Sequence, residues 1–107
     1  MLSNQLEDIL IENIDQQFKD AARDYVIKES TDTPFLQITL EMTLYNYFVV
    51  RASIEKNTIF FSIIQSGFQF SLLDAPLSES SLKKALSNLS HEIKLRIPDK
   101  YLEAKGW

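Results

Sequence analysis

The sequence contains no cysteine, only one histidine, His91, and only two glycines, Gly67 and Gly106. Without cysteine the chain has no disulfide framework, no thiolate zinc site and no cysteine nucleophile. A single histidine excludes metal sites built on a pair of histidines, and two isolated glycines do not make a phosphate-binding loop. We therefore expect no metal, no cofactor and no enzymatic activity, with a small enzyme that uses carboxylates only as the remaining alternative of that class.

Long apolar segments and an excess of basic charge are also missing. The longest uncharged run, 57–73, is shorter than the ~20 apolar residues that a membrane-spanning helix needs. Glu7 and Asp8 stand where a secretory signal peptide would be apolar. The formal net charge of −4 disfavours direct contact with nucleic acid, which usually relies on Lys and Arg. These features favour a cytoplasmic protein that binds neither membranes nor nucleic acid directly.

The centre of the chain, from Phe35 to Leu73, has the alternating pattern of β-strands. Within 36–44 every second residue is apolar, namely Leu36, Ile38, Leu40, Met42 and Leu44. Three further runs, 48–55, 58–65 and 68–73, are separated by short turns. The pattern predicts a four-stranded antiparallel meander.

The register follows from the rule that opposite residues in an antiparallel pair point to the same face. Two-residue turns at 56–57 and 66–67, and a three-residue turn at 45–47, match apolar residues with apolar ones. The predicted pairs include Leu44 with Phe48, Ala52 with Phe61, Ile63 with Phe70 and Phe61 with Leu72. One face of the sheet then carries the large apolar side chains, Phe61, Phe68 and Phe70 among them, and has to be covered.

The flanking segments have the spacing of amphipathic helices. Residues 4–28 repeat apolar side chains at three- and four-residue steps, and 79–96 do the same after Ser78, a suitable helix cap. A short tail helix is expected between Pro98 and Gly106. The whole chain, 1–107, is predicted to be one α+β domain: a two-layer sandwich of order α-β-β-β-β-α, with both helices on one face of the sheet and the other face open.

Two surface features are candidates for binding a partner. Asp8, Glu12 and Asp15 share one face of the first helix, where they could attract a basic protein. The predicted register also places Val49 opposite Ile64 and Phe60 opposite Leu73 on the open face of the sheet. That apolar cluster within a polar rim is typical of a protein contact, unless the tail, 101–107, covers it.

A small acidic domain without catalytic motifs is most consistent with a protein-binding module. The leading hypothesis is an immunity protein or antitoxin that neutralises a basic, nucleic-acid-acting toxin. A second hypothesis is a secretion-type chaperone, which forms a homodimer and holds a client protein. The first predicts a stoichiometric complex with a folded partner, and the second predicts a stable dimer.

Overall fold

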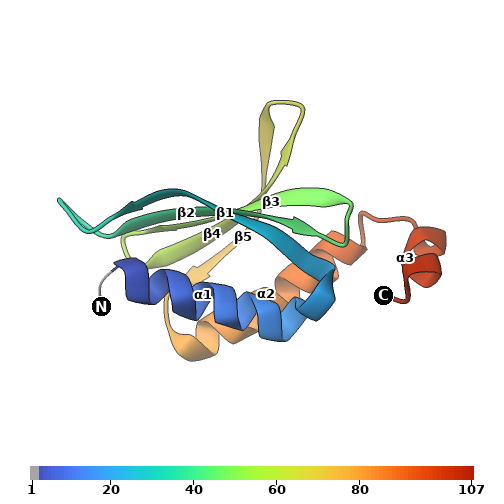
Figure 1. The fold of residues 1–107 in the computed structure, drawn as a ribbon, viewed down its shortest axis with the longest axis horizontal. Helices are drawn as coiled ribbons and strands as arrows, with labels where there is room; N and C mark the ends of the chain where they lie inside the picture. Colours follow the sequence, from blue (N-terminus) through green and yellow to red (C-terminus); the bar gives the residue numbers. More distant parts are fainter. Residues whose placement is uncertain (1–2) are drawn as a thin grey trace.

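The computed structural model describes residues 3–107 and contains one antiparallel sheet whose five strands lie in the order of the sequence (Figure 1). The elements are α1 (Ser3–Phe18), a 3-10 turn η1 (Lys19–Ala21), β1 (Ala22–Thr31), β2 (Gln37–Leu44), β3 (Phe48–Glu55), β4 (Thr58–Gln65), β5 (Phe68–Pro76), α2 (Glu79–Lys94) and α3 (Asp99–Lys105). The α+β class agrees with the prediction, but the predicted number of four strands is wrong.

The helices α1 and α2 lie side by side beneath the sheet in Figure 1, and no helix lies above it in that view. Their inward side chains and one face of the strands form a continuous core, because each element alone would leave its apolar side exposed. The fully buried side chains of this core include Leu10, Ile14, Ile38, Leu40, Met42, Leu44, Ile54, Ile59, Phe61, Leu86, Leu89 and Ile93.

The strand β1 replaces the last part of the predicted first helix, 4–28. Helix α1 ends at Phe18, and Lys19 takes a φ of 54°, in the left-handed region that a regular helix does not use. Residues 22–31 then pair with β2 through two irregularities in register. The helical spacing of Tyr25 with the preceding alanines is misleading there, because Tyr25, Val26 and Ile27 suit a strand and gain a ladder of backbone hydrogen bonds along β2.

The predicted register of β2, β3 and β4 is confirmed. Leu44 lies opposite Phe48, and Ala52 lies opposite Phe61. The three-residue turn at 45–47 and the two-residue turn at 56–57 are both present. Positive φ values occur at Tyr45 and Asn46 in the first turn and at Lys56 and Asn57 in the second, including 51° at Asn46.

The register of β4 with β5 departs from the prediction after its first pairs. Ile63 lies opposite Phe70 as expected, but Phe61 lies opposite Leu73, and Leu72 has no partner. Such a bulge bends the strand and increases its twist. The end of the β4–β5 hairpin accordingly rises from the sheet on the side away from α1 and α2 (Figure 1). Phe70 is 53% exposed, so its predicted burial is wrong.

The carboxy-terminal elements agree with the prediction. The hydroxyl of Ser78 accepts a hydrogen bond from the backbone N–H of Ser81 and caps α2. Gly106 ends α3 with a φ of 77°. The tail packs at one end of the molecule, where the Tyr101 hydroxyl donates to the Tyr45 carbonyl over 2.9 Å. The tail therefore lies against the β2–β3 turn.

Candidate functional site

The acidic face of α1, defined as Asp8, Glu12 and Asp15, lies on the outer side of the helix layer. The opposite side of α1 contributes Leu10 and Ile14, both fully buried, to the core. Steps of three and four residues keep the three carboxylates on one face of the helix, and all three residues are exposed. Burial of the apolar side of α1 thus determines which way these carboxylates point.

No ion pair of these three carboxylates is present among the side chains that the structure describes. Lys19, four residues after Asp15, makes none with it, and the nearby Arg23 lies 3.8 Å from Asp24 instead. The negative charge of the acidic face is therefore not neutralised by those described neighbours. A charged surface of this kind attracts a basic partner most strongly at low ionic strength.

The open face of the sheet contains only part of the predicted apolar cluster. Val49 lies opposite Ile64 as expected, and Val49 and Phe60 are 39% and 40% exposed. Phe60 lies opposite Asp74 rather than Leu73, so the predicted pairing is wrong. The bulge turns Leu73 toward the core, where it packs against the buried residues. Leu73 therefore does not belong to the open face.

A polar network spans four strands of the open face. Arg51 donates from Nε and Nη2 to one oxygen of Glu41, over 3.1 and 2.7 Å, and from Nη1 to Gln69 over 3.1 Å. The Gln69 amide donates in turn to the hydroxyl of Ser62, which is buried. Because Ser62 stands between Phe60 and Ile64 along β4, this network divides the apolar residues of the face.

The structure does not bring the two predicted surfaces together. The acidic face belongs to α1, which lies beneath the sheet (Figure 1), whereas Val49, Phe60 and Ile64 belong to β3 and β4, where they alternate with buried core residues. The tail packs at Tyr45 and leaves Val49 and Phe60 exposed. A single small contact surface could not include both features.

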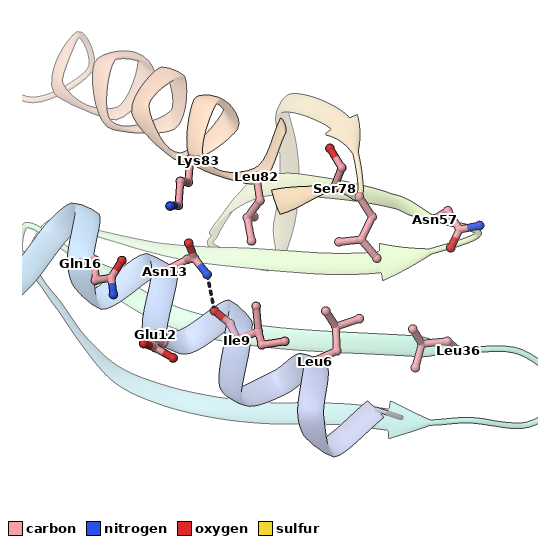
Figure 2. Close-up of a pocket in the computed structure, with 11 residues that line it drawn as sticks. Leu6, Ile9, Glu12, Asn13, Gln16, Leu36, Asn57, Ser78, Leu82 and Lys83 are labelled. Atoms are coloured by element: carbon pink, nitrogen blue, oxygen red, sulfur yellow. Dashed lines mark hydrogen bonds between the residues drawn. The ribbon is translucent and has the colours of Figure 1, made fainter. Parts of the chain in front are cut away.

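A groove of about 730 Å³ runs between α1, from Leu6 to Gln16, and the start of α2 (Figure 2). Its lining residues are Leu6, Ile9, Glu12, Asn13, Gln16, Leu36, Asn57, Leu77, Ser78, Leu82 and Lys83. Asn13 donates from its amide to the Ile9 carbonyl over 2.8 Å, and Lys83 points toward α1 from the other wall. Glu12 is shared by this groove and the acidic face of α1.

The groove could not be predicted from the sequence, because its walls come from two helices and from three connections that are distant along the chain. A smaller cavity of about 470 Å³ lies between β5 and α2 and includes Leu73 and His91. Among the described residues no group of three or more His, Asp or Glu could hold a metal ion.

Two tyrosine hydroxyls have a raised pKa. Tyr45 lies in the core, and burial raises its pKa, while the hydrogen bond with Ser90, 2.8 Å away, lowers it. Burial raises the pKa of Tyr25 as well, and the negative charge of Asp15 adds to the effect. The Tyr25 hydroxyl is buried without a hydrogen-bond partner among the described residues. Both environments favour the neutral phenol and offer no activated nucleophile.

Comparisons with models of protein families, with curated proteins and with solved structures find no match for this chain. None of the helices in the described part of the chain is both long enough and apolar enough to cross a membrane.

Proposed function

We propose that this chain is a cytoplasmic protein-binding module that neutralises a basic partner protein, of the immunity-protein or antitoxin kind. The observation that carries the proposal is the acidic face of α1. Asp8, Glu12 and Asp15 are exposed along one side of a helix that the core holds in place. Such a surface could occupy the positions where a nucleic-acid-acting toxin contacts phosphates.

The groove beside the acidic face supports the same reading. Leu6, Ile9 and Leu82 give it an apolar floor, and Glu12 lies at its margin. A basic partner that approaches the acidic face would therefore also meet an apolar recess. Contacts of this composition, with an apolar centre and a polar rim, are typical of protein interfaces.

Affinity capture from the native host tests the proposal. The tagged protein is expected to retain a basic protein in a stoichiometric complex, and the complex is expected to weaken as salt is raised. The variant Asp8→Asn/Glu12→Gln/Asp15→Asn should lose that partner. The matched control, Glu103→Gln, removes a charge from an exposed position on α3 and should keep it. Retention of the partner by the triple variant would contradict the assignment of the binding surface.

A secretion-type chaperone is the second candidate, because the end of the β4–β5 hairpin displays aromatic side chains. Phe68 and Phe70 are 68% and 53% exposed, and their ring centroids lie 6.5 Å apart. Exposed apolar surface of this kind can hold an unfolded client. This candidate predicts suppression of a client's aggregation that Phe68→Ser/Phe70→Ser abolishes, whereas the triple variant of the acidic face retains it.

A further inference from the structure

The two edges of the sheet differ in how they are protected. The outer edge at β1 contains two register irregularities, a positive φ of 58° at Asp24, and the charged residues Lys28 and Glu29. Bulges and charges of this kind prevent another strand from pairing with an edge. The β1 edge is therefore unsuitable for further strand pairing.

The other edge, at β5, has a segment without such protection. In the sheet formed by the described residues, 3–107, no strand pairs with the outer side of β5. Helix α2 packs beside the second half of β5, around Asp74 to Pro76. All residues of 68–71 are exposed, they pair regularly with β4, and the whole run 57–73 contains no charged residue. This free edge, 68–71, is a template for a further strand.

We propose that the free edge pairs antiparallel with the same edge of a second copy of this chain, around a two-fold axis. We infer a second copy as the partner because the edge is uncharged. The net charge of −4 opposes self-association elsewhere on the surface but causes no repulsion along 57–73. A contact between two identical segments has to be self-complementary, and an uncharged, amide- and aromatic-containing strand meets that condition.

The pleat of the strand selects the register. Phe68 and Phe70 point to the same face, so the pairing that places Phe68 opposite Phe70 of the second copy puts four phenyl rings into one cluster. Gln69 then lies opposite its own counterpart at the two-fold axis. In this register, residues 73–76 of the second copy extend beyond the Gly67 turn of the first copy. The helix α2 that follows them in the second copy therefore lies away from the first copy.

The assembly closes at two copies. Each chain uses its β5 edge once, and the remaining edge at β1 is protected. A two-fold contact therefore consumes the exposed edge without creating another, whereas an open edge would promote further association. The dimer uses a surface separate from the acidic face of α1, so it does not depend on the proposed neutralising function. It covers Phe68 and Phe70, so in the dimer these side chains do not serve as the client-binding surface of the chaperone candidate.

Mass measurement by sedimentation equilibrium, from micromolar to submillimolar concentration, tests the dimer. The wild-type protein should be a dimer, and Phe70→Glu should raise the dissociation constant by about 30-fold or more, as expected for loss of an aromatic hot spot. The matched control Phe60→Glu changes a phenylalanine of similar exposure on the open face and should stay dimeric. A monomeric wild type, or equal masses for the two variants, would overturn the proposal.

Cross-linking tests the register in a protein that has no natural cysteine. Gln69→Cys places two thiols opposite each other at the two-fold axis, within the Cα separation of 4.4–6.8 Å that a disulfide needs. Mild oxidation should yield covalent dimers, whereas Asn57→Cys, in an exposed turn at the opposite end of β4, should remain uncross-linked. Equal cross-linking at both positions would overturn the pairing. The triple variant of the acidic face should remain dimeric, which separates failure of the dimer from failure of the neutralising function.

Discussion

Phe61 of β4 lies opposite Leu73 of β5, and Leu72 between Leu73 and Ser71 has no partner in the ladder. This one extra residue explains two features of the molecule. It turns Leu73 toward the core, and it bends the rest of the hairpin away from the helices. Before the bulge the predicted pairing holds, with Phe70 opposite the buried Ile63, so the side chains of Phe68 and Phe70 are on the core-facing side of the strand. They are exposed because the end of the hairpin extends beyond the helices that would cover them.

Truncation of Phe61 and of Phe70 should have different effects on stability. Phe61 is fully buried, so Phe61→Ala should lower the free energy of unfolding by about 3–5 kcal/mol. Phe70 is 53% exposed, so Phe70→Ala should change it by less than about 1 kcal/mol. Urea denaturation followed by circular dichroism measures both values, at a protein concentration where the wild type and the variants have the same mass.

A half-buried position on the open face provides the control for this comparison. Thr39→Ala removes no core contact and should be near neutral. If Phe70→Ala cost as much as Phe61→Ala in the monomer, the hairpin end would be packed against the core, contrary to the exposure observed here.

The pair formed by Glu41 and Arg51 should be coupled more strongly than an ordinary surface pair. Arg51 makes two hydrogen bonds to one carboxylate oxygen, and the Glu41 side chain is only 16% exposed. A double-mutant cycle with Glu41→Gln and Arg51→Gln should give a coupling energy of about 1 kcal/mol, at the upper end of the range for exposed pairs.

A second cycle, on Glu92 of α2 and Arg96 just after the end of that helix, is the matched control. These residues form a more exposed pair of the i,i+4 type at 3.0 Å. Their coupling should be about 0.3–0.5 kcal/mol and should fall with added salt. A smaller coupling for Glu41 and Arg51 than for the α2 pair would mean that the network on the open face does not hold its side chains in place.

The pairing of β2, β3 and β4 was predictable because side chains alternate between the two faces of a strand. Once one pair of opposite residues is known, the face of all the remaining residues follows. The pairing of Leu44 with Phe48 across an odd turn is an example. Strand β1 was not predictable from the same rule. Most of its side chains are exposed, so it has no alternating apolar face, and its identity depends on pairing with β2.

The candidate sites also differ in whether the sequence predicts them. The acidic face of α1 could be read from the sequence, because Asp8, Glu12 and Asp15 are related by helical spacing within one element. The face to which Leu73 points could not be predicted from the sequence, because a single bulged residue reverses the alternation of the residues that follow it. The groove and the network of Arg51 with Gln69 depend on tertiary contacts, for which a single sequence has no local signal.

Replacement of Tyr25 by phenylalanine should be neutral or stabilising. The Tyr25 hydroxyl is buried and has no hydrogen-bond partner among the described residues, so it has lost its hydration without compensation. Tyr25→Phe removes that cost and should raise the free energy of unfolding by up to about 1–3 kcal/mol. Thermal denaturation would show the change. The control Tyr45→Phe removes a hydroxyl that is bonded to Ser90 and should instead destabilise by about 1 kcal/mol.

The stability of the protein should fall at alkaline pH through its buried phenols. Burial raises the pKa of Tyr45 and of Tyr25 above the ordinary value of 10.0. The unfolded chain therefore loses these protons at a lower pH than the folded chain, and stability decreases as pH rises above about 10. The full contribution of the neutral phenols is present below that pH.

Urea titrations from neutral pH upward should show the decline, and the double variant Tyr25→Phe/Tyr45→Phe should show a smaller one. An unchanged slope in the double variant would assign the alkaline decline to other groups.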